Sequence, residues 1–287
     1  MPDTNEYRHP RPGRAGRLIE RLANSTRFAN WRHAIMSRLP FVTLASDVAD
    51  VVYVSWLVDA QAAQALLPPG LALWQRGGKT PLTVLTYRHG HFGPTLAGPL
   101  RRLMPSPLQS NWRLYLDQAQ DRTQAGAPQA ATVFFLKNIM DSLPHALGTR
   151  LFSDILPTHL AASMTHAVDA NEARCAIVPG AGSAPAFDVH ATVAGVKQLD
   201  EDWRALFGSW EDAVGYLACQ DAAVAHVPRN GRLALGEISL PVDLAKVLPL
   251  TPLRAECALL AQLPALSEPL AFLVPAVPFQ ALSERLL

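Results

Sequence analysis

The chain has 287 residues, of which 49% are hydrophobic and 17% are charged, and its formal net charge is +1. This composition excludes bulk disorder and predicts a soluble globular protein with one large core, and the weak net charge argues against a nucleic-acid platform. Three widely separated cysteines without a CxxC pair favour a reducing compartment, so we expect a cytoplasmic protein.

The sequence divides into three segments. Residues 1–40 carry eight arginines against three acids and are predicted to form a basic tail followed by an amphipathic helix over 17–39. An organellar transit peptide is an alternative for this leader. Residues 41–250 form the main domain, and residues 251–287 an apolar, proline-rich strap that covers a sheet edge or a subunit contact. No apolar stretch is long enough to span a membrane.

Short strands dominate the main domain. Strands are predicted at 51–58, 71–75, 82–88, 111–116, 132–138, 159–168, 174–178, 187–194, 222–227 and 232–240. Helices are predicted at 60–67, 141–155, 200–207 and 210–218. Asn230-Gly231 is the strongest hairpin signal, and the Gly/Pro-punctuated connection 89–110 is of a length that often shapes a site. The fold class is therefore α+β, β-rich: an antiparallel barrel or strongly bent sheet with flanking helices.

Lys137 ends the apolar run Thr132–Leu136, which is typical of a strand covered on both faces. Regular pleating would place Val133, Phe135 and Lys137 on one face. An amine desolvated above such an apolar wall could lose its proton and attack a carbonyl to form a Schiff base. The alternative is that the lysine stem packs on Phe135 while its head reaches water.

A second candidate is the alternating strand that begins at Asn111. Its polar face carries Asn111, Arg113 and Tyr115, and in a barrel with a polar interior Arg113 could clamp a carboxylate beside the Tyr115 hydroxyl. Residues 71–138 hold eight basic residues against two acids, which favours an anionic ligand. A wetted strand face and a basic surface loop are the alternatives.

Histidines offer a third possibility. His89 and His91 would share one side of an extended segment, and His190 could add a third metal ligand. Histidines bonded to backbone or water are the more common arrangement, so we expect no metal and no cofactor. The sequence contains neither a GxSxG nucleophile motif nor a Gly-rich phosphate loop.

From about Val51 to Leu240 the chain resembles the uncharacterised YqjF-like family of the acetoacetate decarboxylase-like superfamily. The matching blocks are Trp56–Asp59, Leu66–Leu71, Asn111–Tyr115, Val133–Leu136, Arg150–Phe152, Leu156–Pro157 and Asn230–Leu233. The resemblance implies a cone-shaped antiparallel barrel with an internal cavity, and a homo-oligomer.

In the decarboxylases of that superfamily, a lysine at the end of an apolar strand forms a Schiff base with a β-keto acid, and Lys137 falls at that place. The family's neighbouring second lysine is replaced by Asn138, and a family carboxylate by Gln109. The resemblance thus implies a cofactor-free lyase acting through an imine at Lys137.

The ligand expected in either case is a small carboxylate or carbonyl compound. We expect it to be bound by Arg113, Tyr115, Asn111, Gln109 and Phe135, with neither a nucleic acid nor a membrane as partner. The alternative function is a non-catalytic ligand-binding or sensor protein of the same fold.

Overall fold

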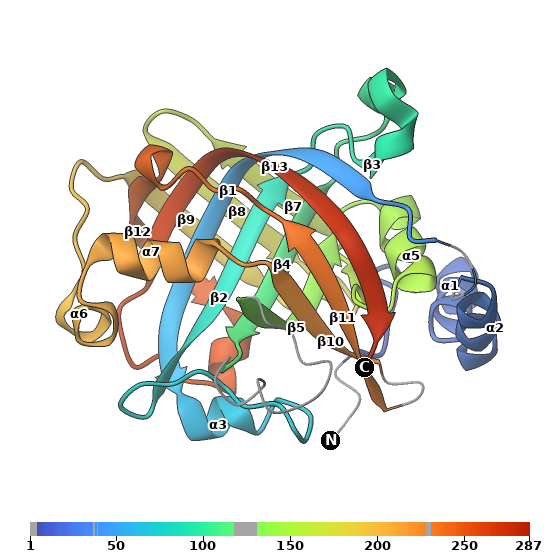
Figure 1. Cartoon of the computed structure of the whole chain (residues 1–287), viewed down its shortest axis with the longest axis horizontal. Helices are drawn as coiled ribbons and strands as arrows, with labels where there is room; N and C mark the ends of the chain where they lie inside the picture. Colours follow the sequence, from blue (N-terminus) through green and yellow to red (C-terminus); the bar gives the residue numbers. More distant parts are fainter. Residues whose placement is uncertain (1–4, 37, 39, 118–130, 228–230) are drawn as a thin grey trace.

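The computed structural model describes residues 5–36, 38, 40–117, 131–227 and 231–287 (Figure 1). Seven strands close into a barrel in the order β1-β2-β4-β5-β10-β11-β13 and back to β1. These strands are β1 (Leu44–Asp59), β2 (Lys79–Arg88), β4 (Leu108–Tyr115), β5 (Thr132–Met140), β10 (Ala222–Val227), β11 (Arg232–Ser239) and β13 (Leu270–Leu286). The predicted β-rich barrel is confirmed. It is mixed, because β5 and β10 run parallel while the other neighbours are antiparallel.

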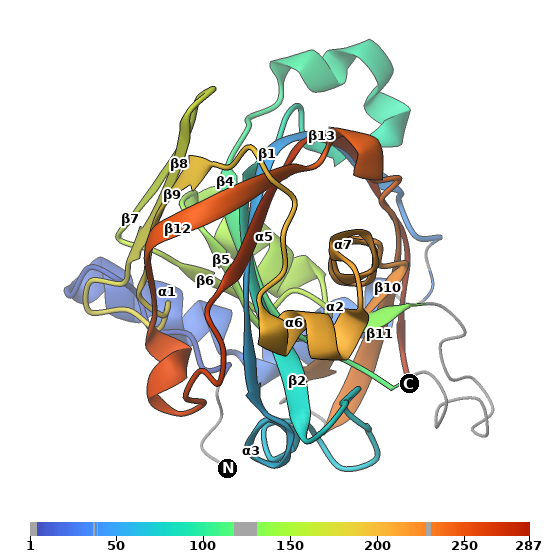
Figure 2. The same cartoon turned by 90° about the vertical axis from the view of Figure 1, so that its left-hand side faces the viewer.

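Beyond β13 the sheet continues through β12 and then β9, β8 and β7, which fold over the outside of the barrel (Figure 2). Their bounds are β12 (Leu248–Cys257), β9 (Phe187–Val193), β8 (Glu172–Val178) and β7 (Ser163–Val168); β3 (Gly93–Pro94) pairs with β1, and β6 (Thr158–Leu160) pairs with β5. A first core lies between these layers, where Trp112 and Phe134 of the barrel wall share one cluster with Val189. A second core fills the barrel interior and includes Tyr53 stacked on Phe272 at 4.6 Å.

Helices close the two ends of the barrel (Figure 1). At one end lie α1 (Arg14–Ala23), α2 (Thr26–Met36) and α5 (Leu143–Phe152); at the other lie α6 (Glu201–Phe207) and α7 (Trp210–Ala218). Shorter pieces are α3 (Ala60–Gln64), η1 (Thr95–Leu103), η2 (Leu244–Lys246) and η3 (Ala258–Ala261). None of the described helices combines the length and the apolar character needed to cross a membrane.

The single helix expected over 17–39 is two helices, and residues 37 and 39 lie outside the described part of the chain. The break falls at Asn24, whose side chain exchanges two hydrogen bonds with the backbone of Tyr7, at 2.9 and 2.8 Å. Ser25 then caps α2, because its hydroxyl accepts a hydrogen bond from the amide of Phe28 at 3.2 Å. Side-chain bonds to the backbone compete with helix continuation, which explains the interruption.

The proline-rich C-terminal segment does not cover a sheet edge as expected. Strand β13 is a full member of the barrel wall, paired with β1 on one side and with β11 on the other. Pro275 is accommodated because it faces Asp50, which interrupts the β1–β13 register with a φ of 54°. Proline at such an irregularity removes no ladder hydrogen bond, so the sequence pattern wrongly indicated a peripheral segment.

Two further expectations changed. Residues 71–75 form no strand of their own, and Leu73 makes only an isolated bridge to Leu116. The β10–β11 hairpin forms as predicted, although Asn230 lies outside the described residues, as does most of the polar loop between β4 and β5.

Candidate functional site

The barrel encloses a cavity of about 400 Å³, a size that accommodates a small organic molecule. Helix α5 and the ends of β11 and β13 form its outer part, and the barrel interior forms its inner part. Its walls are largely aliphatic and aromatic, with contributions from Val48, Val51, Tyr53, Leu85, Val133, Phe135, Ile155, Leu156, Val277 and Phe279. A ligand that fills this space must therefore be mostly apolar.

A hydrogen-bonded cluster of neutral side chains lies where β4 and the residue after β2 line the cavity, and through Asn138 and Thr158 it reaches Thr149 of α5. The Gln109 amide donates to Oδ1 of Asn111 at 2.9 Å and to Oδ1 of Asn138 at 2.7 Å. Its carbonyl oxygen is therefore the acceptor for Nε2–H of His89, at 2.6 Å. This assigns the His89 tautomer and leaves Nδ1 to accept from the Ser46 hydroxyl at 2.8 Å.

Burial keeps this cluster uncharged. It lowers the pKa of His89 to about 4, so the imidazole is neutral at pH 7. Burial also raises the pKa of Tyr87, whose oxygen accepts from the Asn111 amide at 3.2 Å. The Tyr87 hydroxyl hydrogen has no acceptor among the described side chains, so it is available to a ligand in the cavity.

Arg113 brings a cation to the same region. Its guanidinium is buried, donates to the Leu217 carbonyl at 2.5 Å, and lies over the rings of Tyr53 and Tyr115 at 5.4 and 5.5 Å. Within the described part of the chain Arg113 contacts no carboxylate, and its buried Nε has no hydrogen-bond partner. Tyr115 does not line the cavity; its hydroxyl donates to the Leu217 carbonyl at 3.0 Å, the same carbonyl that accepts a hydrogen bond from Arg113.

Lys137 lies elsewhere than expected, because β5 contains a β-bulge. Lys137 pairs with Trp112 while Phe135 pairs with Arg113, so Leu136 is an extra residue and the alternation of faces reverses. Lys137 consequently shares the outer face with Trp112, and its Nζ lies 3.4 Å from Nε2 of His159. The prediction that Lys137 faces the same side as Phe135 is wrong, and Lys137 is not among the residues that line the cavity.

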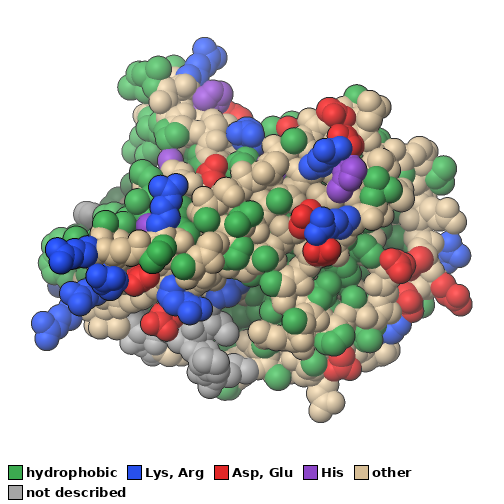
Figure 3. Space-filling view, turned by 180° about the vertical axis from the view of Figure 1, so that it is seen from behind, with side chains coloured by type: hydrophobic (Ala, Val, Ile, Leu, Met, Phe, Trp, Pro, Cys, Tyr) green, Lys and Arg blue, Asp and Glu red, His purple; other side chains and the backbone are tan. Residues whose placement is uncertain are grey.

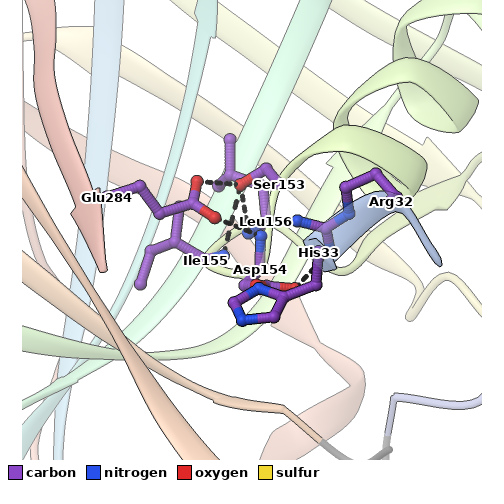
Figure 4. Close-up of polar contacts among 7 residues, drawn as sticks. All are labelled: Arg32, His33, Ser153, Asp154, Ile155, Leu156 and Glu284. Carbon is purple, nitrogen blue, oxygen red and sulfur yellow. Dashed lines mark hydrogen bonds and ion pairs between the residues drawn. The ribbon is translucent and has the colours of Figure 1, made fainter. Parts of the chain in front are cut away.

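A partly buried carboxyl group on the cavity wall was not anticipated from the sequence. Glu284 of β13 accepts hydrogen bonds from the Ser153 hydroxyl, at 2.6 Å, and from the amide of Asp154 (Figure 4). Asp154 in turn pairs with Arg32 of α2. Burial, together with the nearby Asp154 carboxylate, raises the pKa of Glu284, against the lowering effect of Ser153 and Arg32. The outer part of the cavity is thus acidic where the inner part is cationic.

The histidines considered as metal ligands are separated. His89 belongs to the hydrogen-bonded cluster around Gln109, His91 contacts Asp47 at 2.9 Å, and His190 contacts Glu172 at 2.8 Å. Across the described ranges, no three His, Cys, Asp or Glu side chains gather in an arrangement that could hold a metal ion.

The sequence matches no known family model, and no curated protein sequence matches it. Solved structures do match. An acetoacetate decarboxylase-like enzyme from Sphingomonas wittichii RW1 aligns with a TM-score of 0.57 and 12% identity over 87% of this chain and 94% of that one. The enduracididine biosynthesis enzyme MppR aligns with a TM-score of 0.56 and 15% identity, over 87% and 88% of the two chains.

Acetoacetate decarboxylase from Legionella pneumophila aligns with a TM-score of 0.52 and 12% identity, over 85% of this chain and 86% of that one. MppR has also been solved in complex with pyruvate, and that structure aligns with a TM-score of 0.54 at 16% identity over 86% and 91%. The chain therefore has the acetoacetate decarboxylase-like fold, at identities that establish the fold and not the activity.

Proposed function

We propose that this protein binds a largely apolar organic acid or carbonyl compound inside the barrel, with the polar head of the ligand at the inner end. The observation that carries the proposal is the buried guanidinium of Arg113, which borders the cavity with no acidic partner in the described structure. The pyruvate complex of the structural neighbour MppR, a protein of the same fold, is consistent with a carboxylate or carbonyl ligand.

An unpaired buried charge is costly, and the cost is removed when a counter-charge enters. Tyr53 and Tyr115 compensate Arg113 with their π faces, and Leu217 with one carbonyl. A ligand carboxylate beside the guanidinium would supply the negative charge that these neutral groups lack. Tyr87 adds a neutral hydroxyl donor, so a carbonyl oxygen could be bound there as well.

The distribution of charge also fixes the ligand's direction. Glu284 lines the outer part of the cavity and Arg113 the inner part. An anionic head is repelled by the first group and attracted by the second, while the apolar body contacts the aliphatic walls between them. We therefore place the head inward and the tail toward α5.

Ligand binding without imine chemistry is the function we favour. An imine requires an amine that reaches the ligand carbonyl, whereas Lys137 lies on the outer face of β5 and the cavity side of this strand end carries Asn138. A lyase acting through Lys137 stays as the alternative proposal, motivated by the fold.

Membership of the YqjF-like family, a cytoplasmic location and assembly into homo-oligomers are further parts of the proposal. They depend on the sequence resemblance and on the cysteine usage, and light scattering of the purified chain would test the oligomer.

Displacement of a fluorescent apolar probe by medium-chain carboxylic acids tests the proposal. Ala281→Phe would fill the cavity, while Leu282→Phe introduces the same side chain at the next residue, which is exposed and does not line the cavity. We expect the first variant to lose at least about tenfold in affinity, or about 1.4 kcal/mol, and the second to bind like the wild type. Acids should also bind more tightly than alcohols of equal length.

Equal effects of the two substitutions, or displacement that does not saturate, would overturn the proposal. A circular dichroism spectrum of each variant checks that the fold is retained.

A further inference from the structure

The outward face of α1 combines arginine with leucine. Ile19 and Ala23 point inward and pack on the cluster that contains Tyr7 and Met140, so the apolar inward side of the helix is covered by the body of the protein. The opposite side carries Arg14, Arg17 and Arg21 together with Leu18, which is 68% exposed, and Leu22. Positions 14, 17, 18, 21 and 22 lie on one side of a helix with 3.6 residues per turn.

Helix α2 repeats this arrangement. Arg27, Trp31 and Ile35 follow one another at four-residue spacing on the exposed side, and Trp31 is 61% exposed. The inward side is occupied by Phe28, which contacts Phe152, and by Arg32, which pairs with Asp154. An indole left this exposed beside arginines is typical of a surface that contacts a membrane interface.

The 3₁₀ segment η1 adds a third apolar element. It projects from the barrel at the same end as α1 and α2 (Figure 1) and carries Leu96 and Leu103 with 87% and 85% of their surface exposed, beside Arg102. Seen from behind, this end shows lysine or arginine side chains next to hydrophobic ones (Figure 3). We call the exposed arginines and apolar side chains of α1, α2 and η1 the basic apolar end.

The outer part of the cavity lies between these elements. Phe41, which follows α2, and Phe152, at the end of α5, line the cavity and are themselves exposed, and the Phe152 ring is 6.4 Å from that of Phe28. Phe92 lines the cavity just before η1. The basic apolar end therefore surrounds the side of the barrel from which an apolar ligand would enter.

We propose that the basic apolar end docks onto the surface of an anionic phospholipid bilayer. Arg14, Arg17, Arg21 and Arg27 of this end are exposed and form no ion pair in the described structure, and the same is true of Arg38, which follows α2. Among residues 5–38 the acids described are Glu6 and Glu20, and Glu20 accepts a hydrogen bond from the amide of His9 at 2.8 Å. Beside η1, Asp47 lies 3.7 Å from Arg101. A cationic surface with projecting leucines and a tryptophan is complementary to anionic headgroups above an acyl region.

A second copy of the chain is a poorer occupant of this surface. A two-fold interface places the same patch on both partners, so these arginines would face arginines with few acids to pair with them. The apolar side chains also project from separate elements and form no groove for a single peptide, whereas a lipid surface accepts scattered insertions.

Peripheral docking needs no spanning segment. The expectation of no membrane partner followed from the absence of a long apolar stretch, which bears on spanning alone. Exposure of Trp31 and Leu96 could not be inferred from the sequence, because both occur in patterns that equally describe a packed helix or a loop.

Sedimentation of the full chain with vesicles tests this inference. We expect binding to vesicles of phosphatidylcholine mixed with phosphatidylserine, weak binding to phosphatidylcholine alone, and at least about tenfold weaker binding in high salt. Leu96→Gln with Leu103→Gln should weaken binding about tenfold, and so should Arg17→Gln with Arg21→Gln. Leu253→Gln is the matched control, an exposed leucine on β12 at the other end of the molecule (Figure 1).

These positions are exposed, so the variants should unfold at the wild-type urea midpoint. Equal binding to neutral and anionic vesicles, no binding at all, or an equal loss in Leu253→Gln would overturn the inference. The inference would also fail if the wild type did not bind vesicles and the Leu96/Leu103 variant changed from oligomer to monomer, because the surface would then be a subunit interface. Ligand displacement in the absence of vesicles tests the cavity separately, so either proposal can fail alone.

Discussion

Asn138 faces the same side of β5 as Phe135, although three positions separate them. The extra residue at the bulge produces this relationship: it turns Lys137 outward and places an amide, instead of an amine, on the inward face of β5, where it bonds Gln109 of the cavity wall. An amide can orient a ligand through hydrogen bonds, but it cannot form an imine.

Borohydride trapping with short keto acids should leave Lys137 unmodified. Its Nζ lies on the outer face of β5 beside His159, where a ligand in the cavity does not reach it. Peptide mass spectrometry of the treated protein measures the outcome, and Lys137→Ala serves as the blank. A ligand-dependent adduct on Lys137 that is absent from the blank would restore the imine mechanism.

Asn138→Leu should destabilise the fold by about 1–3 kcal/mol, because it leaves one buried N–H of Gln109 without an acceptor and removes the hydrogen bond to the Thr158 hydroxyl. The urea midpoint of unfolding measures this change. Asn30→Leu, at an exposed asparagine of α2, is the control and should shift the midpoint little. A similar midpoint in both variants would contradict the assigned hydrogen-bond cluster.

Stability should fall as the pH is lowered from about 6.5 to 4. Burial lowers the pKa of His89 to about 4 in the folded state, so the unfolded chain takes up the proton first as the pH falls. Neutral His89 therefore contributes fully to the free energy of unfolding at pH values above the pKa of the unfolded chain. This contribution, about 3 kcal/mol, is lost as the pH falls to the pKa of the folded state. The same direction applies to His166, whose pKa burial also lowers to about 4.

Urea unfolding of the wild type and of His89→Gln at several pH values tests this contribution. The variant should lose less stability than the wild type over the same interval, because glutamine does not titrate. Parallel pH profiles would show that His89 is not the group responsible.

Glu284→Gln should become more stable relative to the wild type as the pH rises from 4 to 7. Burial raises the pKa of Glu284 in the folded state. The protonated side chain therefore contributes to the free energy of unfolding at pH values below the pKa of the unfolded chain, and this contribution is lost as the pH rises through the folded-state pKa. The difference in urea midpoints between variant and wild type measures this effect, and Glu211→Gln, on an exposed part of α7, is the control. A difference that shrinks with rising pH would contradict it.

Most of the fold could be predicted, because alternation and turn residues are local signals. Strand 222–227 and its hairpin partner appear where the pattern placed them, as do the helices near 201–207 and 210–218. The site was less accessible. The residue types of β5 do not reveal the bulge beside Lys137, because a bulge is a shift in the pairing with the neighbouring strand, here at Trp112 of β4. Glu284 was missed because its neighbour Asp154 is distant in sequence.

Closure of the barrel has a consequence for biosynthesis. Strand β1 emerges from the ribosome early, yet it completes its pairing only with β13, which follows almost all of the described chain. Before β13 is synthesised, Tyr53 lacks its stacking contact with Phe272 and the wall of the cavity is incomplete. The barrel should therefore close only after β13 has been synthesised, and folding should be slow, because the contacts that close the barrel are so distant along the polypeptide.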